Sequence, residues 1–202
     1  MRWVGRANVR KRLELLEGTD GRTTYDGGAM TIEGVLTARP SFPLAHTGRY
    51  EFVHVAPLLE AIDEDHTVAV LLVRLGGYAA AMFEGERIVA SKVGDRFVKG
   101  RHRAGGSSAN RFRRRRENQA KALVEEAADT AARVLREAPF AALGGDRTAV
   151  DATLAARPEL AWLRERALPR FFTVPDPRRR VLERLPYDLY AVAVDEAGDA
   201  PA

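Results

Sequence analysis

One stretch of the sequence concentrates residues that could act on a polyanion: Lys99 to Lys121, KGRHRAGGSSANRFRRRRENQAK. It holds nine Lys and Arg residues against one acid, Glu117, a local charge of +8, whereas the whole chain carries +4. A basic patch this concentrated favours a polyanionic partner such as nucleic acid. The alternative that this spacing leaves open is a flexible, solvated basic loop.

The glycine pair within this stretch has a chemical use of its own. Gly105 and Gly106 can adopt positive φ and lack Cβ atoms, so the backbone there can approach a ligand closely. Ser107 or Ser108 is a candidate N-cap for the helix that follows. A helix start offers unpaired N–H groups and a partial positive charge. We therefore expect a tip that holds phosphates and presents N–H donors to a reacting carbonyl or water.

Composition restricts the class of protein. A hydrophobic content of 46% and a charged content of 30% are typical of a soluble globular chain. No apolar run is long enough to span a bilayer, and the amino terminus lacks the apolar core of a secretory signal. Cysteine is absent, which excludes disulfides, thiolate catalysis and cysteine metal sites. We expect a cytoplasmic protein.

The elements that must position the basic stretch follow from hydrophobic periodicity. We expect a helix over 2–17, a short strand over 29–38 and a helix over 56–65. A three-strand meander over 67–75, 78–86 and 87–97 leads into the basic loop. A long helix over about 110–138 comes next, followed by a buried strand over 140–145 and a helix capped by Asp146. The remaining expected elements are a helix over 158–167, a strand over 170–174, a helix over 175–185 and an edge strand over 187–197. Trp3 is expected to be a core or interface anchor.

The long helix has one apolar stripe and one basic side. Its stripe is formed by Phe112, Ala120, Leu123, Ala127, Ala131 and Val134. Arg111, Arg114, Arg115 and Asn118 lie off the stripe and should face solvent or a ligand. Uncompensated like charges at these spacings disfavour a helix, which suggests that a partner supplies the negative charge. A solvated helix face is the alternative.

The loop and helix start resemble a known family. The central domain of eukaryotic and archaeal class-one peptide chain release factors has a Gly-Gly-Gln-Ser-Ala loop, then an Arg-Phe pair and further arginines on a long helix. Here GGSSANRFRRRRENQ keeps that order without gaps, at Gly105, Gly106, Ser108, Ala109, Arg111, Phe112 and Arg114. The meander and the later strand, glycine pair, aspartate and helix also fit, so the resemblance covers residues 50 to 190 or so. The chain is most similar to the Vms-like release factors (the VLRF family), in particular to the actinobacterial branch of peptidyl-tRNA hydrolases.

The resemblance implies both fold and function. The fold would be α/β (α+β), an RNase H-like mixed five-stranded sheet with flanking helices over 66–202, with the basic GGSS loop at 99–110 and a small N-terminal layer over 1–65. The function would be hydrolysis of the peptidyl-tRNA ester in stalled ribosomes or large subunits. The partners would be peptidyl-tRNA and large-subunit rRNA, with no cofactor, no metal, no membrane contact and a monomeric chain.

The resemblance also implies roles for single residues. The catalytic residues would be Gly105, Gly106, Ser107 and Ser108. The nucleic-acid-binding residues would be Lys99, Arg101, His102, Arg103, Arg111, Arg113, Arg114 and Arg115.

One of these positions departs from the family pattern, because Ser107 stands where the release factors have their catalytic Gln. Serine keeps the backbone N–H thought to stabilise the oxyanion but loses the side chain that helps to place water. The loss of such a contact lowers a rate by roughly 10²–10³. A catalytically impaired ribosome- or tRNA-binding factor on the same fold is therefore the alternative.

Two other chemistries find little support in the sequence. A two-metal nuclease needs clustered carboxylates at strand ends, and the acids Asp95, Asp146, Asp176 and Asp188 are dispersed. A metal site on His46, His54 and His66 fits no local ligand spacing. The run Arg178 to Arg180 is either a second nucleic-acid contact or, as we favour, a solvated helix start.

Overall fold

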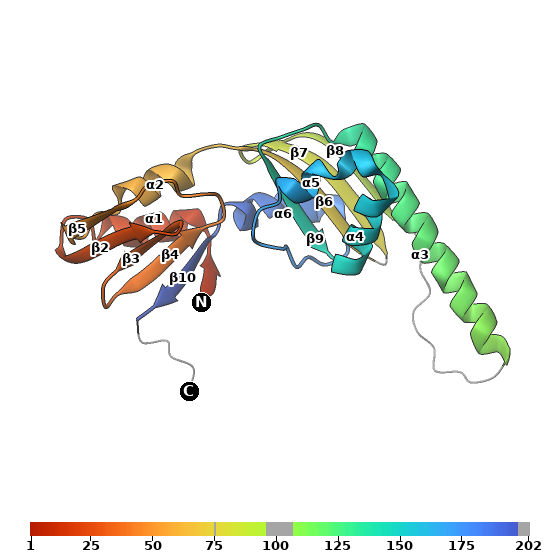
Figure 1. Ribbon diagram of the computed structural model, residues 1–202, viewed down its shortest axis with the longest axis horizontal. Coiled ribbons are helices and arrows are strands. Elements are labelled where there is room, and N and C mark those ends of the chain that lie inside the picture. Colours follow the sequence, from red (N-terminus) through yellow and green to blue (C-terminus); the bar gives the residue numbers. More distant parts are fainter. Residues whose placement is uncertain (75, 96–106, 198–202) are drawn as a thin grey trace. The chain divides into compact units, whose positions relative to one another are not determined.

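The computed structural model describes residues 1–74, 76–95 and 107–197, and within these it leaves the side chains of 107–113 and 116 undescribed. The chain forms two compact units (Figure 1). Unit 1 consists of Met1–Glu64 with Leu185–Ala202, and unit 2 of Asp65–Arg184. We had expected 66–202 to form one domain, whereas the C-terminal segment groups with the N-terminal one.

Unit 1 is built on a six-stranded sheet in which every pair is antiparallel. Its order is β1 (Arg2–Val4), β10 (Val192–Glu196), β4 (Leu36–Pro40), β3 (Ala29–Ile32), β2 (Asp20–Asp26) and β5 (Gly48–Phe52). Helices α1 (Arg6–Glu14) and α2 (Ala56–Asp63) belong to the same unit. The first and last strands of the chain are therefore hydrogen-bonded neighbours.

One apolar core joins these helices to the sheet. Leu13 from α1 and Leu58 from α2 share it with Met30, Ile32 and Val192, and all five side chains are almost completely buried. Val192 and Val194, two residues apart on β10, both belong to this core, whereas Asp195 after them is exposed and Ala193 between them is buried. Burial of this kind is the main stabilising term for the unit.

Several expectations for unit 1 were wrong. The segment 2–17 is not one helix, because Arg2–Val4 pairs with β10 and α1 begins only at Arg6. Trp3, expected as a core or interface anchor, lies on edge strand β1 and is 40% exposed, so it is not part of the core, and the interface role stays a prediction. The single strand expected over 29–38 is a hairpin, β3 and β4, with Gly34 at a φ of +71° between them. The last strand, expected at the edge of the main sheet, lies instead between β1 and β4.

Unit 2 contains the mixed sheet, in the order β8 (Arg87–Asp95), β7 (Gly77–Glu84), β6 (Thr67–Arg74) and β9 (Phe140–Gly145). The three-strand meander is confirmed, since β6, β7 and β8 pair antiparallel in succession, and β9 adds in parallel to β6. Residues Val68 to Val73 of β6 have no exposed surface. A continuous apolar run is typical of a central strand that is covered on both faces.

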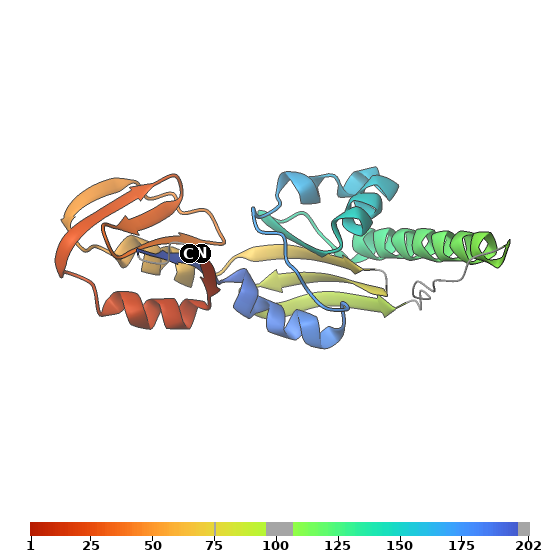
Figure 2. The same ribbon diagram turned by 90° about the horizontal axis from the view of Figure 1, so that it is seen from below.

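Helices lie on both faces of this sheet. These helices are α3 (Ser107–Val134), α4 (Arg147–Ala156), a 3₁₀ turn η1 (Pro158–Leu160), α5 (Trp162–Glu165) and α6 (Arg179–Leu189). Ala69, Leu71 and Val73 of β6 share a core with Leu123 and Ala127 of α3. Figure 2 shows α4 and α5 on one side of the sheet and α6 on the other. The mixed α/β class expected from the sequence is therefore confirmed.

The sheet of unit 2 has four strands among the described residues, whereas we expected five. The segment 170–174 forms only an isolated bridge, in which Phe172 N–H donates to the Leu143 carbonyl (2.9 Å) and Gly145 N–H to the Phe172 carbonyl (2.9 Å). The backbone approaches so closely that a Cβ on Gly144 would lie 2.5 Å from the Phe172 oxygen. The segment 187–197, expected as a final edge strand, supplies β10 to unit 1. The RNase H-like topology stays a prediction.

Candidate functional site

The basic stretch enters the described structure as the first part of α3. The helix runs from Ser107, and among its described side chains the first that is fully buried is Leu123, followed by Ala127, Ala128 and Ala131. At 1.5 Å per residue, the part before Leu123 spans roughly 24 Å. Figures 1 and 2 show this part of α3 running past the end of the unit 2 sheet. Of the stripe expected on the long helix, Leu123, Ala127, Ala131 and Val134 pack on the core, and Phe112 lies among the side chains that the structure leaves undescribed.

Two arginines of the projecting part have described side chains. Arg114 and Arg115 are exposed, and within the part of the chain that the structure describes neither has a hydrogen bond or an ion-pair partner. Further along, Lys121 lies 4.0 Å from Glu125 in a solvent-exposed pair. Arg114 and Arg115 are thus open to an external anion, as expected from their position off the apolar stripe.

The other site residues fall into two groups. Ser107, Ser108, Arg111 and Arg113 lie in the first turns of α3, where only the backbone is described. The structure describes α3 from Ser107 onward, so the expectation that Ser107 or Ser108 caps the helix stays a prediction. Outside the described residues lie Lys99, Arg101, His102, Arg103, Gly105 and Gly106.

A tyrosine that we did not single out from the sequence fastens α3 to the sheet. The Tyr78 hydroxyl, on β7, donates to Glu126 Oε1 (3.1 Å) and accepts from Thr130 Oγ1 (3.2 Å), both on α3. Its ring is 2% exposed and lies over Gly94 of β8, where any Cβ would collide with it. Burial is the main cause that raises the pKa of Tyr78 above its ordinary value. Two features of the sequence could have pointed to this contact. Tyr78 is a tyrosine in an alanine-rich strand, and Thr130 lies among the alanines of the long helix.

The position of Tyr78 matters because β8 leads into the basic stretch. Gly77 and Tyr78 pair with Asp95 and Gly94, the last residues of β8. The tyrosine therefore holds together the strand that enters the stretch and the helix that leaves it. With both hydrogen-bonding capacities of the hydroxyl used inside the protein, Tyr78 is a positioning residue rather than a substrate contact.

The carboxylates that a nuclease would need do not gather. Asp146 is the N-cap of α4, where it accepts from Ala149 N–H (2.9 Å), as predicted. Asp95 ends β8, and Asp176 lies beside Gly76. Within the residues described, no three His, Cys, Asp or Glu side chains are grouped as metal binding requires.

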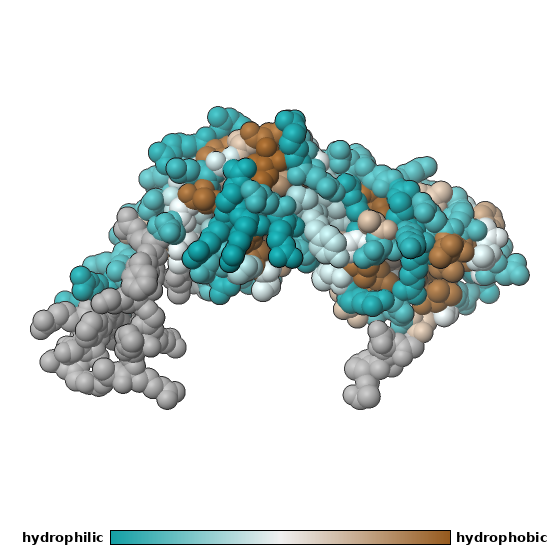
Figure 3. Space-filling model, turned by 180° about the vertical axis from the view of Figure 1, so that it is seen from behind, coloured by the Kyte–Doolittle hydropathy of each residue, from teal (hydrophilic) through white to brown (hydrophobic). Residues whose placement is uncertain are grey.

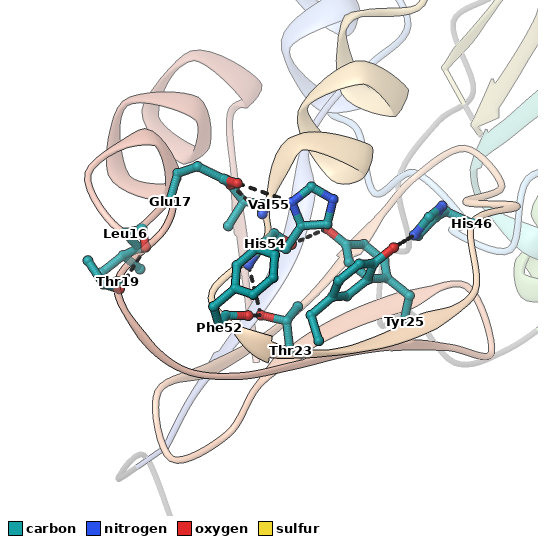
Figure 4. A network of polar contacts seen from close by, with 10 residues as sticks. Leu16, Glu17, Thr19, Thr23, Tyr25, His46, Phe52, His54 and Val55 are labelled. Atoms are coloured by element: carbon teal, nitrogen blue, oxygen red, sulfur yellow. Dashed lines mark hydrogen bonds and ion pairs between the residues drawn. The ribbon is translucent and has the colours of Figure 1, made fainter.

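The histidines considered as metal ligands make other contacts. In unit 1, His54 Nδ1 lies 3.1 Å from Glu17 Oε1, and the other Glu17 oxygen accepts from Val55 N–H (Figure 4). His46 Nε2 lies 2.9 Å from the Tyr50 hydroxyl. His66 belongs to unit 2, where its ring packs edge-on against Phe140.

Comparison with known proteins finds one family whose model covers the part of the chain that contains α3. The family model described as Actinobacteria/chloroflexi VLRF1 release factor matches residues 66–195, which include the meander, the basic stretch and α3. A search of curated proteins finds no match. No helix in the described ranges is long and apolar enough to cross a membrane. Since the match covers more than half of the chain, the protein belongs to the Actinobacteria/chloroflexi VLRF1 release factor family.

Proposed function

We propose that this protein hydrolyses the ester of peptidyl-tRNA in stalled ribosomes or large ribosomal subunits. The observation that carries the proposal is the position of the Gly-Gly-Ser-Ser sequence at the start of α3, a helix whose first part projects past its own core with free arginines on it. A buried helix start would argue against access to a substrate. Membership of a release factor family supplies the class of substrate.

The projecting helix suits a substrate that lies inside a larger particle. A rod of roughly 24 Å projects from the bulk of unit 2, and the glycine pair comes directly before it in the sequence. Arg114 and Arg115 would bind phosphates of tRNA or rRNA, where charge neutralisation releases counterions and strengthens binding. Because guanidinium forks pair with phosphate oxygens through two hydrogen bonds, these contacts would also fix the orientation of the helix.

The reaction needs few groups from the protein. Water attacks the ester carbonyl, the bond to the tRNA 3′ oxygen breaks, and that oxygen takes up a proton. Glycines allow the backbone to reach the carbonyl, and the N–H of Ser107 would stabilise the developing oxyanion. Water, the terminal 2′-hydroxyl and the ribosomal cavity would supply the rest. This fits the described residues, among which we find no nucleophile with an adjacent base.

The alternative is a factor that binds ribosomes or tRNA without hydrolysis. The specific observation in its favour is Ser107 at the position of the family's catalytic Gln. Both proposals share the arginine contacts, so binding alone cannot separate them. Turnover separates them.

Release of peptide from peptidyl-tRNA, with and without large subunits, tests the proposal. Gly106→Ala should lower the release rate about 10²-fold or more, because a Cβ hinders close approach of the backbone. Gly76→Ala is the matched control, since a Cβ at Gly76 would meet only ordinary contacts at 3.5 Å or more. It should release peptide at the wild-type rate.

Equal rates for wild type and Gly106→Ala would remove the glycine pair from catalysis. Co-sedimentation of the wild type with large subunits, without any release, would establish the binding factor instead. If the wild type neither binds large subunits nor releases peptide, both proposals are contradicted.

A further inference from the structure

A second row of arginines in unit 2 lies away from α3. Arg178 comes directly before α6, and Arg180 and Arg184 lie in its first two turns. All three are exposed, and among the described residues none of them has a hydrogen-bond or ion-pair partner. Their neighbour Arg179 differs, because it bonds to Glu183 (3.1 Å) and to Ser91 Oγ (3.2 Å). The row of three is therefore open to an external anion.

The fold gives no reason for these charges. The helix is held by the opposite side, where Val181 and Leu182 are buried. Arginines at a helix N-terminus oppose the helix dipole. Arg180 and Arg184 are also one turn apart, a spacing at which like charges repel. Three side chains that weaken their own helix are best explained by a partner that carries negative charge.

Acidic groups nearby do not neutralise the row. Glu183 is occupied by Arg179. Asp176, at the preceding turn, lies beside Gly76. The carbonyl of Arg178 accepts the Val181 N–H (2.8 Å), so its backbone is fixed at the helix start while its side chain is exposed.

The row lies beside the strand that leads to the basic stretch. The bond from Arg179 to Ser91 places the start of α6 against β8, the edge strand of the sheet. The same strand ends at Asp95, four residues before the basic stretch begins at Lys99. Figure 3 shows the side of unit 2 on which α6 lies, where hydrophilic side chains gather.

We propose that Arg178, Arg180 and Arg184 form a second contact with the phosphate backbone of RNA. The inference rests on the proposed function, since RNA is the polyanion that a release factor meets. Exposed guanidinium groups suit phosphate because each fork can donate two parallel hydrogen bonds to it. RNA held by the basic stretch would continue along the β8 side of unit 2 to α6. This contact would strengthen binding and would take no part in the hydrolysis proposed for residues 105–108.

The test is the salt dependence of binding by the full chain to purified large ribosomal subunits. Each phosphate contact contributes about 0.7–0.9 to the slope of log K against log salt. The double variant Arg180→Ala with Arg184→Ala should therefore make this negative slope shallower by about 1.5. It should also weaken binding on the order of tenfold at low salt. Arg87→Ala with Arg164→Ala is the matched control. It removes the same charge from unit 2, but from arginines paired with Glu84 and Asp151, and should keep the wild-type slope.

A conservative pair of variants excludes a merely structural effect. Arg180→Lys with Arg184→Lys keeps the charges and should recover most of the slope. If the Lys pair binds as poorly as the Ala pair, the residues act on the fold and the inference fails. The inference fails also if the Ala pair and the control pair bind large subunits with the same salt dependence. An acidic protein partner for these arginines would give that result.

The two proposals can fail separately. If the variant Arg180→Ala with Arg184→Ala keeps the wild-type salt dependence and peptide release depends on Gly106, the second contact is overturned and the proposed function stands. A lowered slope without peptide release would keep the RNA contact and point to the binding factor. A wild type that binds no subunits would overturn the contact on α6.

Discussion

At position 107 a serine follows the glycine pair, and it is the first residue of α3. Its backbone N–H has no partner within the helix, because the first four N–H groups of a helix point beyond it. This donor is available to an oxyanion whatever the side chain is. What serine lacks is the reach of a glutamine amide, which could hold a water molecule against the ester.

We predict that Ser107→Gln speeds peptide release. The variant would restore one placement contact, which changes a rate by roughly 10²-fold in comparable sites. Single-turnover release from peptidyl-tRNA on large subunits measures it. Ser108→Gln, one position on, is the control and should bring no gain. A Ser107→Gln rate at or below that of the wild type would show that this site does not use the missing amide.

Among the elements, α3 depends on a small set of contacts, because the described side chains that are fully buried begin only at Leu123. The alanines at 127, 128 and 131 allow the helix to pack closely on the sheet, but they fix its position along the strand only weakly. The Tyr78 hydroxyl supplies a directional contact, with one bond donated to Glu126 and one accepted from Thr130. A helix whose first part projects past its own core (Figure 1) needs such a fixed base.

We predict that Tyr78→Phe destabilises the protein by about 1–3 kcal/mol near pH 7, because two partners of a buried hydroxyl lose their bonds. Urea unfolding measures this, with Tyr187→Phe as a control on a ring that is 63% exposed. The control should change stability by less than about 0.5 kcal/mol.

The stability difference between the wild type and Tyr78→Phe should depend on pH. Burial raises the pKa of folded Tyr78 above its ordinary value of 10.0. The stabilisation is therefore complete below pH 10 and declines above it, as the unfolded chain loses a proton that the folded state keeps. The gap between wild type and Tyr78→Phe should narrow above pH 10. A constant gap up to pH 11 would contradict this assignment.

At the scale of the whole chain, the two ends fold together. β10 comes from the last described residues, yet it lies between β1 and β4 and places Val192 in the core of unit 1. The family match ends at residue 195 and so includes all of this strand but its last residue. Unit 1 is thus completed only by residues that follow unit 2 in the sequence.

We predict that Val192→Asp opens unit 1 and leaves unit 2 folded. A carboxylate at a fully buried position destabilises by about 4 kcal/mol or more unless it is paired. Hydrogen exchange should show loss of protection in β2 to β4, more than a hundred residues away in sequence, while β6 and β7 stay protected. Asp195→Asn, on the exposed side of the same strand, should leave both units protected. Equal loss in both units would mean that they do not fold independently.

The sequence by itself determined the elements whose signals are local. The continuous apolar run of β6, the glycine turns of the meander, the Asp146 cap and the alanine stripe of α3 each depend on neighbours a few residues apart. For the same reason it located the basic stretch and the glycine pair. Tertiary structure decided what depends on distant partners. Strands β2 and β5 lie in polar sequence and form because they pair with each other. Strand β10 joins the sheet of unit 1 rather than that of unit 2, which is nearer in the sequence. Tyr78 gains its role from Glu126 and Thr130, which lie 48 and 52 positions away. Pairing energy between segments far apart in the chain leaves no periodic trace in either segment, so only the folded molecule reveals it.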